Sequence, residues 1–210
     1  MTSHDLVAEF HKLYYDARER TWKNTTWLGV GVQKCPLDLW VYQEILFELR
    51  PDVIVETGTA AGGSALFLAT VCDLMRHGTV VTVDIEEPPE RPVHRRIRYV
   101  LGSSVSEETV GEVRDGIAER AKVMVILDSD HSRDHVLAEL RLYSKLVSTG
   151  QYLIVEDTNI NGRPVRPDFG PGPAEAVSDF LAETDAFEID REREKFLMTF
   201  NPDGFLRKVA

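Results

Sequence analysis

The sequence predicts an α/β fold in which a mainly parallel, doubly wound sheet is covered by helices on both faces. Two observations predict it, together with the general handedness of crossovers. Five short apolar runs rich in β-branched residues read as strands buried on both faces. They cover residues 53–57, 79–83, 97–101, 123–127 and 152–155. Helical stretches alternate with them, as in βαβ units, at residues 63–76, 106–119 and 133–147. Right-handed crossovers then wind the helices onto the two faces of the sheet.

The N-terminal region lies outside this alternating pattern. Residues 5–20 carry apolar side chains at helical spacing, which predicts an amphipathic helix. Residues 21–37 are expected to be irregular. A second helix is predicted from Asp38, the expected N-cap, to about Arg50, where Pro51 stops it.

The C-terminal region predicts a different ending to the sheet. After a helix at 174–184, two apolar runs follow at 186–190 and 195–200. Only four residues separate these runs, too few for a parallel crossover, so they are expected to pair antiparallel. No linker interrupts the chain. We therefore expect an N-terminal helical cover at 1–50 and one compact domain at 51–210.

Composition narrows the function classes. The chain has 210 residues, 43% of them hydrophobic, and a formal net charge of −11 from 24 basic and 35 acidic residues. This is the composition of a globular protein, and its acidity argues against nucleic acid as the main partner. No apolar run approaches the ~20 residues of a membrane helix, and the first residues do not resemble an export signal. With only Cys35 and Cys72, no disulfide framework is expected, and we predict a cytoplasmic protein.

A glycine-rich turn follows the first predicted strand. Residues 56–64 read Glu-Thr-Gly-Thr-Ala-Ala-Gly-Gly-Ser, and the second strand ends at Asp84. Glycines at such a bend accept positive φ and allow a ligand to approach the backbone, while the acid suits a ribose diol. The spacing is not the G-x-G-x-x-G of pyrophosphate sites, and it favours a nucleoside without phosphate. A tight turn beside a solvated acid is the alternative interpretation.

Acidic residues follow the fourth and fifth predicted strands. Asp128 ends one strand, and Glu156 and Asp157 end the other. If these strands are parallel neighbours, their ends lie about 5 Å apart. Converging carboxylates must be neutralised by protons, a basic side chain or a divalent cation, and oxygen ligands favour magnesium, manganese or calcium. Helix capping or solvation of these acids is the alternative, and Asp130 or Ser132 suits a capping role.

The pattern Glu-x-Gly-x-x-x-Gly with an acid at the end of strand two resembles the class I S-adenosylmethionine-dependent methyltransferases. That resemblance implies a Rossmann-like, seven-stranded sheet, mostly parallel with an antiparallel last strand. It places the glycine turn against the methionine part of the cofactor, two side chains on its amino and carboxylate groups, one acid on the ribose, and a Gly-Ser-Ser segment beside adenine. The implied cofactor-binding residues are Glu56, Gly58, Thr59, Gly62, Ser64, Asp84, Ser103, Ser104 and Asp128.

The acid set is similar to that of metal-dependent O-methyltransferases. Within that group the chain most resembles the cephalosporin hydroxylase and rhamnosyl O-methyltransferase family, across most of residues 25–207. The sequence motifs that carry this resemblance are Trp-x-Gly from residue 27, Lys-x-Pro-x-Asp from residue 34, ETGTAAGGSALF, LDSDHS, VEDTNING and Asn-Pro-x-Gly from residue 201. The resemblance implies Mg2+ or Mn2+ held by Asp128, Glu156 and Asp157. The Asp-x-x-His step to His131 also resembles macrolide sugar O-methyltransferases, in which that histidine is the base.

These features predict a magnesium-dependent sugar O-methyltransferase that uses S-adenosylmethionine. A metal can lower the pKa of an acceptor hydroxyl and orient it. His131 is the first choice of catalytic base, Asp130 the second and His135 the third. The resemblance implies a rhamnoside, mannoside or other glycoside acceptor. Residues 161–173, rich in Pro and Gly, could form an acceptor loop, with Arg163, Arg166 and Phe169 as contacts.

Two other function classes remain open at this point. One is an antibiotic-tailoring protein like the cephalosporin hydroxylase members, in which a reduced nicotinamide would enter the same cleft. The other is a cofactor-binding protein without catalysis. We also expect no nucleic-acid or membrane partner, and a homo-oligomer, with a dimer as the form to test first.

Overall fold

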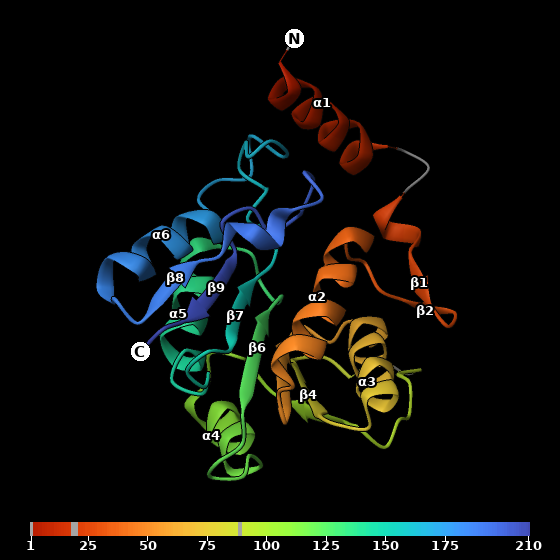
Figure 1. Cartoon of the computed structure of the whole chain (residues 1–210), viewed down its shortest axis with the longest axis vertical. Coiled ribbons are helices and arrows are strands. Elements are labelled where there is room, and N and C mark those ends of the chain that lie inside the picture. Colours follow the sequence, from red (N-terminus) through yellow and green to blue (C-terminus); the bar gives the residue numbers. More distant parts are fainter. Residues whose placement is uncertain (1, 18–20, 88–89) are drawn as a thin grey trace.

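A seven-stranded sheet forms the centre of the computed structural model, which describes residues 2–17, 21–87 and 90–210 (Figure 1). From one edge to the other its strands are β5 (Ile97–Leu101), β4 (Thr79–Asp84), β3 (Val53–Thr57), β6 (Val123–Leu127), β7 (Tyr152–Val155), β9 (Phe205–Lys208) and β8 (Phe187–Ile189). The neighbours from β5 to β7 are parallel, and β9 is antiparallel to both β7 and β8. The predicted fold class, with its antiparallel last strand, is confirmed.

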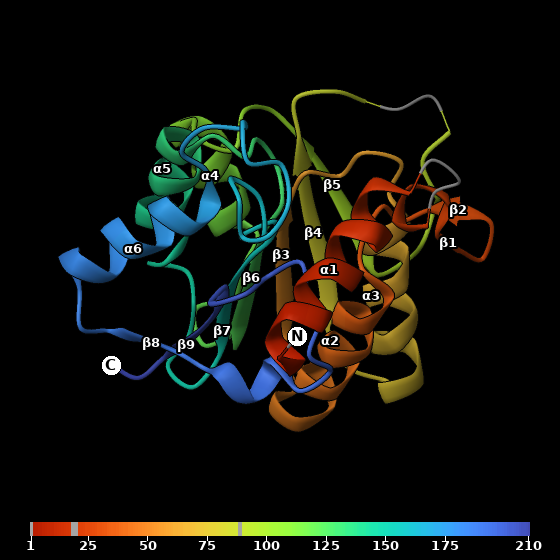
Figure 2. The same ribbon diagram turned by 90° about the horizontal axis from the view of Figure 1, so that it is seen from above.

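Helices cover both faces of the sheet (Figure 2). One face carries α4 (Glu107–Asp115), α5 (Arg133–Tyr143) and α6 (Pro173–Glu183); the other carries α2 (Pro36–Leu49) and α3 (Gly63–Met75). The first helix, α1 (Ser3–Asp16), packs near the carboxyl end of β7, where Asn159 Nδ2 donates to His11 Nε2 over 2.9 Å. No helix among the described residues is long and apolar enough to cross a membrane.

Strand alternation decides which helix layer each side chain meets. In β3, Val53 and Val55 pack in the cluster that includes α4, α5 and α6, whereas Ile54 packs in the cluster that includes α2 and α3. Successive side chains in a strand point to opposite faces. The same alternation carries Glu56, and Glu156 at the end of β7, toward the α2 side of the sheet.

The predicted start of the second helix is wrong. The N-cap of α2 is Cys35, with Pro36 in the first turn, and it makes no side-chain cap hydrogen bond. Asp38 lies inside the first turn, is buried, and accepts a hydrogen bond from the backbone N–H of Phe200 over 2.9 Å. Its carboxylate therefore fixes the C-terminal loop instead of capping the helix.

The predicted hairpin partner is also wrong. The strand that pairs with β8 is β9, and residues 195–200 form no strand. Met198 and Phe200 are instead buried against Cys35 in a small separate cluster, which the rings of Tyr15 and neighbouring aromatic residues surround. Tertiary packing therefore takes the apolar side chains of this run away from the sheet.

Residues 21–37 are more regular than expected. A 3-10 turn η1 (Trp22–Asn24) precedes a two-stranded antiparallel hairpin of β1 (Thr26–Trp27) and β2 (Val30–Gly31). A second 3-10 turn, η2 (Arg191–Glu194), follows β8. The first predicted helix ends at Asp16, and residues 18–20 of that prediction lie outside the described residues.

Candidate active site

A cavity of about 530 Å³ opens at the carboxyl ends of the parallel strands. Its size is within the range of small-molecule sites, and its position is where ligands bind in open α/β sheets. The lining combines the glycine turn after β3, the acid at the end of β4, the Gly-Ser-Ser segment after β5, and polar residues that follow β6 and β7. Of the predicted cofactor residues, those that line the cavity are Gly58, Thr59, Ser64, Asp84, Ser103, Ser104 and Asp128.

The glycine turn is shaped by close backbone contact. Gly58 has φ +84°, and a Cβ there would lie 1.9 Å from the backbone oxygen of Asp128. Asp84 braces the same turn, because its Oδ2 accepts the backbone N–H groups of Thr59 and Ala60 over 2.8 and 3.0 Å. The ends of β3, β4 and β6 are thereby locked together around the floor of the cavity.

Two of the predicted cofactor residues lie outside the lining. Gly62, with φ +82°, caps α3 and faces Pro92. Glu56 is fully buried behind the turn, where its Oε2 accepts a hydrogen bond from Thr82 and burial raises its pKa to about 7. Its Oε1 has no hydrogen-bond partner within the part of the chain that the structure describes. A cofactor role for these two residues stays a prediction.

An unpredicted polar network lies beside the Gly-Ser-Ser segment. His135 Nε2 is 3.1 Å from Ser104 Oγ and 3.2 Å from Ser129 Oγ. Ser129 donates to the fully buried Glu139 over 2.7 Å, and hydrogen bonding to this carboxylate raises the pKa of His135. His135, the third choice of base, therefore belongs to the β5 end of the cavity.

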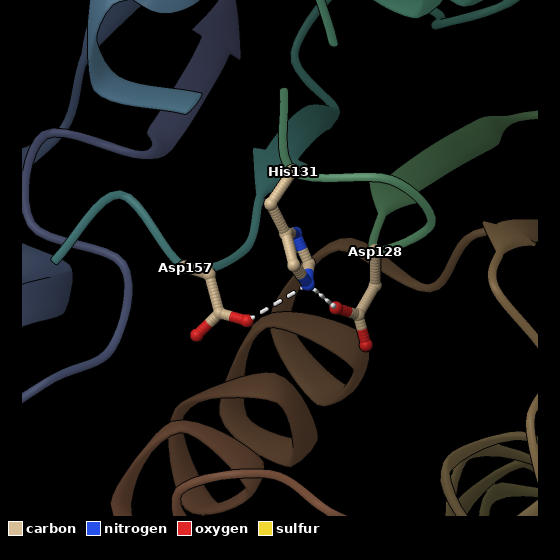
Figure 3. Close-up of side chains that lie close together, drawn as sticks. All are labelled: Asp128, His131 and Asp157. Atoms are coloured by element: carbon tan, nitrogen blue, oxygen red, sulfur yellow. Dashed lines mark ion pairs between the residues drawn. The ribbon is translucent and has the colours of Figure 1, made fainter. Parts of the chain in front are cut away.

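Three side chains converge where β6 and β7 end (Figure 3). One donor atom each from Asp128, His131 and Asp157 lies within 4.8 Å of the others. His131 Nε2 is 3.1 Å from Asp157 Oδ2 and 4.0 Å from Asp128 Oδ1. Desolvation raises the pKa of Asp157. Two carboxylates and an imidazole in this arrangement can hold a cation or move a proton.

The set that converges differs from the predicted acid set, because His131 takes the place of Glu156. Alternation along β7 sends Glu156 toward α2, and Asp157, in the left-handed region at φ +56°, turns to the other side. Glu156 Oε1 accepts from Lys34 over 2.7 Å and from Tyr42 through a short hydrogen bond. Within the described residues, Glu156 Oε2 has no hydrogen-bond partner. A role for Glu156 as the third cation ligand stays a prediction.

Asp130 lies at the rim of the cavity and holds the approach to α5. Its Oδ1 accepts the backbone N–H of Ser132 over 2.7 Å. Hydrogen bonding with Ser132 lowers the pKa of Asp130. A carboxylate stabilised in its ionised form is a weak proton acceptor, so the geometry favours His131 over Asp130 as a base.

Asn201, in the late Asn-Pro-x-Gly segment, clamps the turn that carries the two β7 acids. Its Oδ1 accepts the backbone N–H of Asp157 over 3.1 Å, and its Nδ2 donates to Tyr42 Oη over 2.8 Å. A Cβ on Gly204 would lie 2.4 Å from the backbone oxygen of Val155. The segment therefore acts on the site by fixing Asp157, a function that spacing alone did not indicate.

The wall beyond the acid cluster comes from distant parts of the chain. Tyr15, Trp22 and Arg166 line the same cavity as His131 and Asp157. Trp22 Nε1 donates to the backbone oxygen of Tyr15 over 3.1 Å, which fixes the two aromatic residues together. Of the three predicted loop contacts only Arg166 lines the cavity; its guanidinium lies over the ring of Phe169, and Arg163 pairs with Asp203.

Comparisons with known proteins place this geometry in context. A family model described as rhamnosyl O-methyltransferase/CmcI matches residues 19–209. The chain is 43% identical to a rhamnosyl O-methyltransferase of Mycobacterium bovis over 210 residues, covering 96% of this chain and 85% of that protein. A rhamnosyl O-methyltransferase of Mycobacterium leprae is 42% identical, with 96% and 90% covered.

Solved structures share the fold. A CmcI-N160 apo-structure superposes with a TM-score of 0.70 at 23% identity, covering 90% of this chain and 77% of that one. A structure described as cmcI-D160 Mg-SAM gives 0.66 at 22% identity, with 90% and 78% covered. The sheet order and the cavity at its carboxyl edge thus define a protein with a Rossmann-like methyltransferase fold. More specifically, the chain belongs to the rhamnosyl O-methyltransferase/CmcI family.

Proposed function

We propose that this protein is an O-methyltransferase that transfers the methyl group of S-adenosylmethionine to a sugar hydroxyl with the help of a divalent cation, Mg2+ or Mn2+. Family membership supports the reaction class. The observation that carries the proposal is the convergence of Asp128, His131 and Asp157 in the same cavity as the glycine turn. In that arrangement a cation and a base would lie in the same cavity as a pocket suited to a nucleoside.

The cofactor fits the β3–β5 side of the cavity. The glycine turn leaves backbone exposed beside Ser64, and Asp84 faces the cavity with Oδ1 bonded only to the N–H of Glu86 within the described residues. A carboxylate oxygen can accept a further hydrogen bond, so Asp84 retains capacity for a ribose hydroxyl. The bound sulfonium would supply an electrophilic methyl group that needs no further activation.

A divalent cation fits the acid cluster by its donor chemistry. Asp128 and Asp157 offer carboxylate oxygens, the ligands that Mg2+ and Mn2+ favour. A bound cation would lower the pKa of an acceptor hydroxyl and orient it. Asn201 and the left-handed turn at Asp157 hold one of these ligands at the cavity edge without further reorganisation.

His131 is the proposed base. Its Nε2 points between the two carboxylates, where it can accept the proton of an acceptor hydroxyl as the oxygen attacks the methyl carbon (Figure 3). With the methyl donor bound, the hydroxyl oxygen would form the new O–C bond as the S–C bond breaks, and His131 Nε2 would take the proton. Asp157 would then stabilise the resulting imidazolium over 3.1 Å.

The acceptor is proposed to be a glycoside that enters against the Tyr15, Trp22 and Arg166 wall. Two relatives are named as rhamnosyl O-methyltransferases, which makes rhamnosides the first acceptors to test. Two neighbouring hydroxyls of a sugar could share the cation. We further propose a cytoplasmic location, supported by the two buried free cysteines, and a dimer, which light scattering would test.

The test is a mass-spectrometric screen of glycosides, α-rhamnosides first, incubated with S-adenosylmethionine and MgCl2. A product heavier by one methylene, absent in EDTA, is expected. No methylated product with any glycoside would refute the acceptor class. Calorimetric binding of NADH in place of S-adenosylhomocysteine would instead favour the antibiotic-tailoring alternative.

A further inference from the structure

Lys34 is a buried cation at the back of the acid cluster. It is 2% exposed, and its Nζ lies 2.5 Å from Asp128 Oδ2 and 2.7 Å from Glu156 Oε1. It comes from the segment that leads into α2, whereas the two acids end β6 and β7. One ammonium group therefore ties the tips of two neighbouring strands to the helix layer in front of them.

Several carboxyl groups surround Lys34. Asp128 and Glu156 contact it directly, and Glu56, Asp38 and Asp157 lie close enough to interact electrostatically with it. Within the described residues, Lys34 is the only lysine or arginine that pairs with Asp128 or Glu156. A buried lysine is rare unless paired, and removing one partner of a buried pair leaves an uncompensated charge.

Lys34 contacts only one carboxylate oxygen of each acid. Asp128 gives Oδ2 to Lys34, while its Oδ1 faces His131 and the cluster. Glu156 likewise gives Oε1 to Lys34 and Tyr42. Lys34 thus takes one oxygen from each acid and leaves the other oxygen of each unclaimed by a lysine or arginine.

We propose that Lys34 is a positioning and charge-balancing residue of the cation site, which holds Asp128 and Glu156 in place and limits how tightly a divalent cation binds. The inference rests on the proposed function for the presence of that cation. Three carboxylates, Asp128, Glu156 and Asp157, together with one ammonium carry two net negative charges, and a divalent cation balances them. Without Lys34 the same acids would bind the cation more tightly and quench more of its charge.

Loss of the Lys34 charge should change cation affinity in the opposite direction to a simple loss of structure at the site. Like charges about 5 Å apart interact strongly enough, even at an effective dielectric constant of ~20, to change an affinity more than tenfold. Loss of the Lys34 charge should therefore strengthen cation binding while it destabilises the cation-free protein. A variant that merely loosened the site would bind the cation more weakly.

The test is a titration of EDTA-stripped full-length protein with MnCl2, followed by calorimetry and by the Mn2+ electron paramagnetic resonance signal. Lys34→Met and Lys34→Gln should each bind Mn2+ at least tenfold more tightly than the wild type. In EDTA, both variants should have a lower melting temperature than the wild type. Saturating MnCl2 should raise their melting temperatures by more than it raises that of the wild type. Lys34→Gln keeps hydrogen-bond donors for the acids, so it serves where Lys34→Met does not fold.

Two controls make the outcome specific. Lys34→Arg keeps the charge and should bind Mn2+ within about threefold of the wild type. Lys195→Met removes a surface lysine paired with Glu44 and should leave Mn2+ binding unchanged. Unchanged or weaker Mn2+ binding in both neutral Lys34 variants would overturn the inference. Failure of the wild type itself to bind Mn2+ would refute the proposed metal role, and the inference with it.

Discussion

Replacement of Gly58 by alanine probes the contact that joins the glycine turn to the acid cluster. An alanine there must adopt φ +84° and place its Cβ 1.9 Å from the Asp128 carbonyl oxygen. The left-handed conformation costs about 1–2 kcal/mol and overpacking a further 1–3 kcal/mol. Since the atom struck is rigid backbone, the tips of β3 and β6 must separate, and Asp128 must move with them.

Gly150→Ala is the matched control, because Gly150 has the same φ of +84° with nothing within 4 Å of its Cβ position. Gly150→Ala should lose only the stability that the left-handed backbone conformation costs, without the overpacking cost. We therefore expect Gly58→Ala to be less stable than Gly150→Ala by about 1–3 kcal/mol in urea unfolding, which is about 2–12 °C in melting temperature. Binding of S-adenosylhomocysteine, measured by calorimetry, should weaken at least tenfold in Gly58→Ala alone. Equal losses of stability and unchanged binding in the two variants would show that the contact between Gly58 and Asp128 does not shape the site.

Three further predictions follow from the site. Asp157→Asn removes a charged ligand and should weaken Mn2+ binding at least tenfold, as charge-assisted contacts contribute about 1.5–3 kcal/mol; calorimetry with an unchanged Mn2+ affinity would exclude it as a ligand. His131→Gln should lower methyl transfer by about 10²–10⁴ while Mn2+ affinity stays within about threefold, and a rate profile with wild-type speed at every pH would exclude the base role. Burial lowers the pKa of His11 to about 4 from 6.5, so stability present above pH 6.5 should fall as pH drops toward 4. The loss is on the order of 3 kcal/mol, and His11→Gln should abolish this dependence in urea unfolding; a wild-type slope in that variant would contradict it.

The strands of the sheet were predictable because each central strand has a recognisable local sequence pattern. The central parallel strands, such as Val123–Leu127, are short apolar runs, and burial on both faces leaves few other structures open to them. The last strand pair was not predictable in the same way. Residues 195–200 and Phe205–Lys208 both carry apolar side chains. Phe205–Lys208 pairs with β8, whereas Phe200 packs against Tyr15 of α1 and away from the sheet.

The site was predictable only in part, for a related reason. Asp128 and Asp157 follow strands, so parallel topology alone brings them to one edge of the sheet. Glu156 was expected beside them, although alternation along β7 turns it toward α2. Lys34 lies 94 residues from Asp128 in the chain, and no local pattern marks such a contact. A buried lysine becomes visible only once the fold is known.

Anomalous diffraction from crystals grown with MnCl2 and S-adenosylhomocysteine would locate the cation and the nucleoside together. We expect one manganese peak bonded to Asp128 and Asp157, with His131 Nε2 nearby and the nucleoside lying against the glycine turn. A peak bound elsewhere, or no peak between these carboxylates at saturating manganese, would contradict the proposed cation site.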